Sequence, residues 1–120
     1  MSQFIAVDVE TANADLASIC QIGVVTFDDT GPLSTWQSLV NPEDVFDAVN
    51  VSIQGITEEA VKDAPTLPAV CDRLRAAMAD QIVVCHTAFD RIAVWRVCEK
   101  YQLPPIECHW LDSARVVRRT

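Results

Sequence analysis

The alternation of apolar and polar positions in the first third of the chain predicts three β-strands. Residues 4–7 form an apolar run, and residues 19–27 and 33–40 are rich in apolar and β-branched side chains. Residues 28–32 (Asp-Asp-Thr-Gly-Pro) form a turn between the second and third runs, and the Asn-Pro pair at 41–42 ends the third. The pattern therefore predicts an antiparallel meander of three strands.

The rest of the chain alternates between helical and strand patterns. Residues 43–56 lose the period and are expected to form a loop with short helical turns. Thr57, followed by two glutamates, begins a brief helix, and Thr66 begins a longer one. The longer helix has apolar residues along one face, at Leu67, Val70, Cys71, Leu74, Ala77 and Met78.

A second strand pattern follows the longer helix. Residues 81–85 are a short apolar run, typical of a strand buried on both faces in the parallel part of a sheet. A helix is expected from residue 86 to about 101 and a short strand over 106–111, after which Asp112 or Ser113 would cap a last helix. Together these elements predict one α/β domain over residues 1–120, with a mixed sheet and flanking helices.

Composition and charge narrow the function classes. The formal net charge of −8 argues against a broad basic surface for duplex nucleic acid. The sequence contains no apolar run of membrane-spanning length and no signal-peptide pattern, so a cytoplasmic protein without membrane contact is expected. The five cysteines are scattered through apolar segments and are expected to be reduced core residues.

The first candidate site lies in the first strand pattern. Strand side chains alternate between faces, so Asp8 and Glu10 project from the same side. Two carboxylates this close repel each other unless a cation binds between them or one is protonated, and such oxygen ligands suit Mg²⁺ or Mn²⁺. The alternative is an ordinary strand end with solvated acids.

A third acid, Asp90, follows the buried strand at 81–85 and lies in the first turn of the next helix. If that strand runs parallel to and beside the first, Asp90 approaches Asp8 and Glu10 at the carboxyl ends of the strands. The alternative is a capping box in which Thr87 caps the helix and Asp90 reaches back to a backbone N–H. His86 has either a structural or a catalytic role, and Phe89 is expected in the core.

Short motifs in a fixed order carry a resemblance to a known family. Asp8-Val9-Glu10-Thr11 has the form D-x-E-T, and a Q-I-G strand, an N-P turn, a G-I-T segment, an A-P-T segment and an H-x-x-F-D-type motif follow at suitable spacing. Across almost its whole length the chain resembles the DEDD (DnaQ-like) 3′–5′ exonucleases, which include the proofreading subunit of bacterial replicative polymerase and ribonuclease T.

The resemblance implies a ribonuclease H-like fold and a metal-dependent nuclease. It implies that Asp8, Glu10 and Asp90 hold two Mg²⁺ or Mn²⁺ ions, and that Thr11, Val9 and His86 adjoin the substrate. The substrate implied is a single-stranded DNA or RNA 3′ end, with a polymerase as a possible partner.

The sequence also departs from the family. Ala12-Asn13 replaces the common Thr-Gly, where Asn13 is the residue best suited to a left-handed turn, and Gln54 stands where a histidine is common. No H-x-x-x-x-D or Y-x-x-x-D pattern follows Asp90, so the chain is expected to be truncated, without the final helix, the fourth acid and the general base. Impaired activity is therefore expected. The alternatives are a non-catalytic module that binds nucleic acid or a polymerase, and a structural domain.

Overall fold

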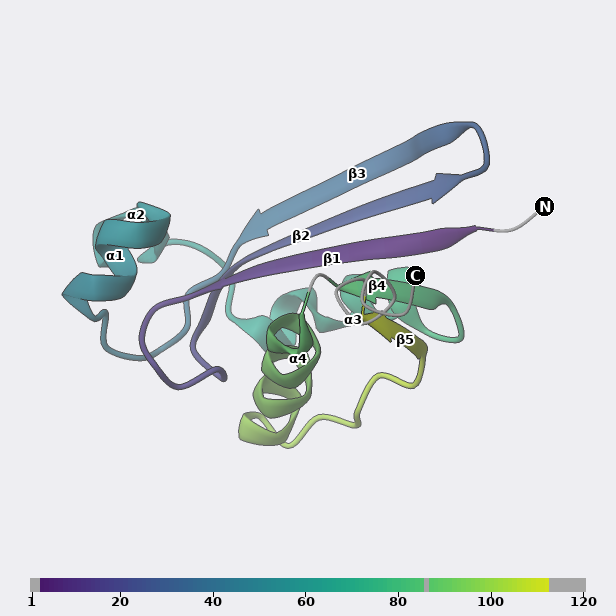
Figure 1. The fold of residues 1–120 in the computed structure, drawn as a ribbon. Coiled ribbons are helices and arrows are strands. Elements are labelled where there is room, and N and C mark those ends of the chain that lie inside the picture. The colour runs from purple at the N-terminus through teal and green to yellow at the C-terminus, as the bar shows by residue number, and fades with distance from the viewer. Residues whose placement is uncertain (1–2, 86, 113–120) are drawn as a thin grey trace.

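Five strands form one mixed sheet in the order β3-β2-β1-β4-β5 (Figure 1). The computed structural model describes residues 3–85 and 87–112. The antiparallel meander consists of β1 (Phe4–Thr11), β2 (Ile19–Asp28) and β3 (Gly31–Leu39). The strands β4 (Ile82–Cys85) and β5 (His109–Asp112) extend the sheet in parallel from β1. The mixed α/β sheet predicted from the sequence is confirmed.

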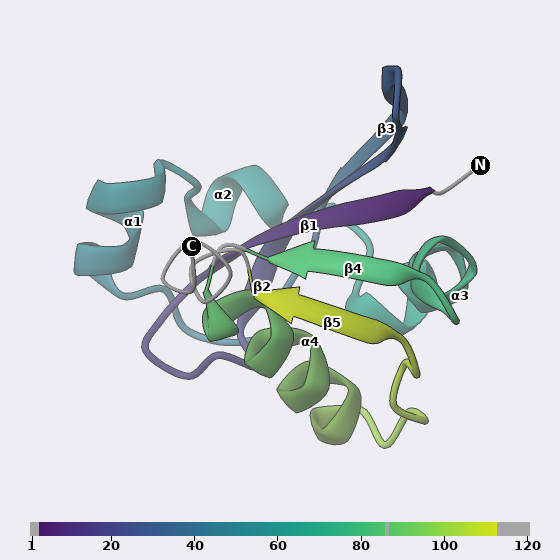
Figure 2. The ribbon, with the colours of Figure 1, turned by 45° about the vertical axis from the view of Figure 1, so that its right-hand side comes forward.

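Four helices accompany the described part of the sheet: α1 (Ala48–Gln54), α2 (Glu58–Val61), α3 (Leu67–Met78) and α4 (Ala88–Lys100). Both ribbon views place α1 and α2 together near the end of β1, and α4 alongside β4 and β5 (Figures 1 and 2). Thr57 and Thr87 cap α2 and α4 through their side chains, as predicted. Thr66 precedes α3 without a side-chain cap bond, and Pro68 occupies its first turn.

One hydrophobic cluster joins the sheet to α3 and α4. Alternate residues of β1 enter this cluster together with apolar residues of both helices, among them Val7, Val9, Leu74, Val94 and Val97. Because the side chains of a strand alternate, the intervening residues of β1 face away from the cluster. This alternation puts the acids of β1 on the face opposite the core.

Three local features differ from the sequence predictions. Strand β1 continues through the acids to Thr11, beyond the apolar run at 4–7. The stretch 43–56 contains a defined helix, α1, capped by Asp47. Asn13 is not left-handed, since the non-glycine residues with positive φ in the described part of the chain are Glu43, Asp80 and Gln102.

The turn at Asn13 is closed by its side chain. Asn13 Oδ1 accepts a hydrogen bond from the Asp15 N–H at 2.8 Å, so the turn does not need a left-handed residue.

Strand β5 ends at Asp112, the last described residue. The helix that Asp112 or Ser113 was expected to cap falls outside the described residues.

The cysteine prediction is confirmed for four of the five residues. All five cysteines are free, four of them are buried, and Cys108 is partly buried. None of the helices within residues 3–85 and 87–112 has the length and apolar character needed to span a bilayer.

Candidate active site

Asp8 and Glu10 lie in β1 on the face of the sheet that points away from the core. Asp8 is paired with Gly23 of β2 and Glu10 with Gln21. These four residues, with Gln37 of β3 and other residues of the meander, line a hollow of about 260 Å³. Because Gly23 has no side chain, the space beside Asp8 stays open, and both carboxylates are accessible from one side of the sheet.

Asp90 approaches the same part of β1 from α4. The last residue of β1 paired with β4 is Ala6, so β1 extends past the pairing with β4. Beyond this point the Val9 N–H donates a buried hydrogen bond of 3.0 Å to Asp90 Oδ1. Asp90 therefore binds the peptide group of the residue between Asp8 and Glu10.

This contact decides between the two readings of Asp90. Thr87 caps α4 by accepting a bond from the Phe89 N–H. The carboxylate of Asp90 extends to β1 instead of closing a capping box with Thr87. The predicted adjacency of β1 and β4 is confirmed, and it brings Asp90 to the strand that carries the other two acids.

The three carboxylates influence one another electrostatically. The pKa of Asp90 is raised to about 6, mainly by burial and to a smaller extent by the charges of Asp8 and Glu10, while the hydrogen bond from the Val9 N–H lowers it. Burial and the charge of Asp8 also raise the pKa of Glu10. In the absence of a cation, a proton is therefore held more tightly at this end of β1 than in water.

The donor chemistry fits a hard divalent cation. Carboxylate oxygens are preferred ligands of Mg²⁺ and Mn²⁺, and a cation would relieve the mutual repulsion that, after burial, contributes to these raised pKa values. Within the described residues, no three acidic, histidine or cysteine side chains are grouped closely enough to form a metal centre by themselves. The case for a divalent cation thus rests on the carboxylate ligands and on the negative charge that they share.

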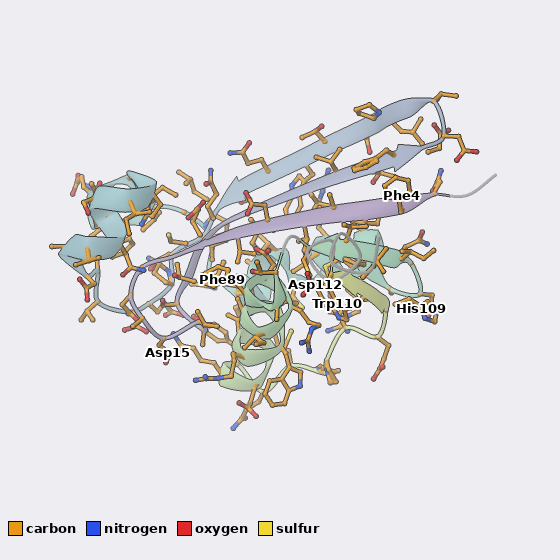
Figure 3. All side chains as sticks on the ribbon, in the orientation of Figure 1. Phe4, Asp15, Phe89, His109, Trp110 and Asp112 are labelled. Carbon is orange, nitrogen blue, oxygen red and sulfur yellow. The ribbon has the colours of Figure 1, made fainter. Side chains whose placement is uncertain are left out.

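The residues expected beside the substrate differ in their surroundings. Thr11, the residue after Glu10, is buried. Val9 points its side chain into the core and its N–H toward Asp90, which leaves little of the residue for a substrate. His86 falls outside the described residues. Phe89 is 37% exposed at the start of α4, so its predicted place in the core is wrong (Figure 3).

Two amide side chains of α1 complete the surroundings of Thr11. The Nδ2 atom of Asn50 donates to the Thr11 carbonyl and hydroxyl, and Nε2 of Gln54 donates to the same carbonyl. Neither contact was predicted from the sequence, because residues 43–56 lack apolar periodicity. The available signal was the pair of amides four residues apart, which share one face of a helix.

Comparison with known proteins gives the family context. The model of a family described as exonuclease matches residues 5–120. A Mycobacterium tuberculosis protein, described as a candidate bifunctional exonuclease/endonuclease, is 29% identical over 97% of this chain. The PolC-type DNA polymerase III of Caldanaerobacter subterraneus is 27% identical over 72% of it. The chain spans 20% of the length of the first relative and 6% of the second.

Solved structures share the fold. Exonuclease X, in a complex with 5′-overhanging duplex DNA, superposes with a TM-score of 0.76 at 24% identity, covering 97% of this chain and 63% of that one. Escherichia coli exonuclease I, bound to an oligonucleotide, gives a TM-score of 0.85 at 16% identity, covering 99% of this chain and 30% of the other. These matches agree with the ribonuclease H-like sheet that the sequence resemblance implied.

Proposed function

This chain belongs to the exonuclease family, and from that membership we propose that it hydrolyses phosphodiester bonds at the 3′ ends of single-stranded nucleic acid. The observation that carries the proposal is the bond between Asp90 and the Val9 N–H, because it brings a third carboxylate to the strand segment of Asp8 and Glu10. The open hollow beside Asp8 leaves room for a substrate on that face.

Asp8, Glu10 and Asp90 would hold the divalent ions, either Mg²⁺ or Mn²⁺. Bound in such a site, a pair of ions supplies activation of the attacking water and stabilisation of the leaving 3′ oxygen. The residues of the chain set the conditions for this chemistry. Strand β1 presents two carboxylates on one face, and α4 fixes the third at the neighbouring edge.

Asp8, Glu10 and Asp90 are the three acids of the described residues that match the family's motifs, and the motif that carries the fourth acid and the general base is not found after Asp90. We propose that the fourth acid and the base of the family come from outside residues 3–112. Loss of a general base typically lowers a rate on the order of a hundred-fold to ten-thousand-fold. The 120-residue chain should therefore be a weak nuclease compared with a family enzyme that has the complete motif set.

The polymerase relative suggests where such an activity would be used. The match to PolC-type DNA polymerase III covers most of this chain but a small part of the polymerase. A proofreading or repair role beside a polymerase is consistent with this, and either DNA or RNA is chemically suitable because both present the same phosphodiester group.

The test is a nuclease assay with a 5′-labelled single-stranded oligonucleotide in Mn²⁺, resolved on a sequencing gel. Stepwise shortening from the 3′ end is expected for the parent chain, with none for Asp8→Ala. A 3′-labelled copy should release labelled mononucleotide at once. Immediate release of mononucleotide from the 5′-labelled strand would reverse the polarity, and binding without any shortening would favour a non-catalytic nucleic-acid module.

A further inference from the structure

Two side-chain amides on α1 hold the backbone next to Glu10, and we propose that Asn50 and Gln54 are positioning residues for the acidic site. They are not expected to touch the substrate or a metal ion. Their function is to fix the direction in which the Glu10 carboxylate points. The inference rests on the proposed function, since it concerns the geometry of the proposed metal ligands.

The Glu10 side chain depends on its backbone for orientation. Among the described residues, none donates a hydrogen bond to its carboxylate or forms an ion pair with it. The backbone at this point is irregular, because the register of β1 and β2 shifts between Glu10 and Thr11. Glu10 is opposite Gln21 and Thr11 is opposite Ile19, so the β2 residue between them, Cys20, has no partner on β1. Such a bulge re-aims the adjacent side chains.

Asn50 and Gln54 bind to both strands of this bulge. Asn50 Nδ2 lies 3.3 Å from the Thr11 carbonyl oxygen, 3.3 Å from Thr11 Oγ1 and 3.2 Å from the Asn13 carbonyl oxygen. Gln54 Nε2 lies 3.4 Å from the same Thr11 carbonyl oxygen and 3.9 Å from Cys20 Sγ. The Thr11 carbonyl is thus shared by two amides, and Gln54 connects β1 to the unpaired residue of β2.

The Gln54 amide is itself held in place. Its Oε1 accepts a hydrogen bond from the Ile56 N–H, and its Nε2 donates to the Ile56 carbonyl at 3.2 Å. The chain can turn back on the side chain in this way because Gly55, which ends α1, has a left-handed φ of 81°. The Gln54 side chain that binds the Thr11 carbonyl is therefore already held in its orientation.

The two amides contribute to the geometry of the acidic site and not to the hydrophobic core. Helix α1 has no buried residue. Its other attachments to the segment after β1 are also polar, with the Asp47 N–H donating to the Ala12 carbonyl and Asn13 Nδ2 donating to the Val45 carbonyl, both at 2.8 Å. Removing the two amides should therefore loosen the bulge without unfolding the protein.

The test measures Mn²⁺ binding from the rise in melting temperature on titration with the ion, without any nuclease assay. Asn50→Ala/Gln54→Ala is expected to bind Mn²⁺ about ten-fold more weakly, as is typical when groups that orient a metal ligand are removed. Its melting temperature without metal should stay close to that of the parent. Ser52→Ala is the matched control on α1, because the Ser52 hydroxyl bonds to the Val49 carbonyl of its own helix. Replacing Gln54 by His instead of Ala, beside Asn50→Ala, keeps an N–H donor and should recover part of the affinity for Mn²⁺.

The same pair of substitutions in Glu10→Gln separates positioning from a general structural effect. If the amides act through Glu10, they should weaken Mn²⁺ binding no further once the carboxylate is gone. An equal further loss in Glu10→Gln, or unchanged binding by the double variant of the parent, would overturn the inference alone. A parent chain that does not respond to Mn²⁺, or an Asp8→Ala variant that responds equally, would overturn the proposed metal site and this inference with it.

Discussion

Helices α4 and α1 both adjoin the acidic segment of β1, but different interactions attach them to the sheet. Helix α4 places Ala93, Val94, Val97 and Cys98 in the core, and only its first turn contributes a polar contact to β1. Helix α1 buries no residue and is attached through amide and backbone hydrogen bonds.

The comparison separates what stabilises the fold from what shapes the site. Burial of apolar surface is the main favourable term in folding, so α3 and α4 should contribute most of the helical part of the stability. When a hydrogen bond forms on a partly exposed helix, hydrogen bonds to water are replaced by one within the protein, so the net gain in stability is small. Changes in α1 should therefore affect the site, and changes in the core helices should affect the whole fold.

The largest expected effect comes from the core side of this comparison. Leu74 of α3 is fully buried, and Leu74→Ala removes apolar contacts and leaves a cavity. We expect the free energy of unfolding to fall by about 2–5 kcal/mol. Urea denaturation followed by circular dichroism measures this loss. A loss smaller than that of the α1 variants would contradict the conclusion that the core helices contribute more stability than α1.

A smaller effect is expected at Asp90, where the core helix meets the site. The pKa of this acid is about 6 in the folded chain, above its usual value, so the folded state binds the proton more tightly than the unfolded state. This contribution to stability is present at low pH and is lost as the pH rises through about 6. A shift of this size corresponds to at most about 3 kcal/mol.

Asp90→Asn keeps an oxygen for the Val9 N–H and removes the charge. In EDTA the variant should be more stable than the parent at pH 7.5, and the difference should shrink toward pH 4. Urea denaturation at both pH values tests this. If the free energy of unfolding changed equally with pH in both proteins, Asp90 would not be the acid that causes the pH dependence of stability.

The smallest effect is expected on the outer face of α1. Val49 is 63% exposed, so Val49→Ala should change the free energy of unfolding by no more than about 0.5 kcal/mol, with a slight gain from the better helix former. Val97→Ala in α4 is the matched control, because the same atoms are removed from a side chain that is 2% exposed. Similar losses from both variants would mean that α1 is packed more firmly than its exposure indicates.

The part of the site predicted from the sequence is the part that depends on strand geometry. The common face of Asp8 and Glu10 follows from the two-residue period of a strand, and it needs no knowledge of the rest of the fold. The position of Asp90 required one further step, the parallel pairing of β1 with β4, which the order of the elements favoured.

The missed parts depend on polar contacts between distant residues. Asn50 and Gln54 lie 39 and 43 positions after Thr11 in the chain, and no apolar pattern marks a contact of this kind. The misplacement of Phe89 has a related cause, since an apolar residue in the first turn of a helix can face solvent when the neighbouring acid turns toward the sheet. The bulge that changes the register of β1 depends on the pairing of two strands, which neither strand specifies alone.

The bond between Val9 and Asp90 joins residues 81 positions apart in the chain. The hairpins of the meander, in contrast, pair neighbours along the sequence and close short loops. Because long loops cost more entropy to close, contacts of high sequence separation are slow to form, and the meander can form before β4 and α4 dock on it. A partly folded chain would thus present Asp8 and Glu10 without Asp90, and the three acids come together only when the folding reaction is nearly complete.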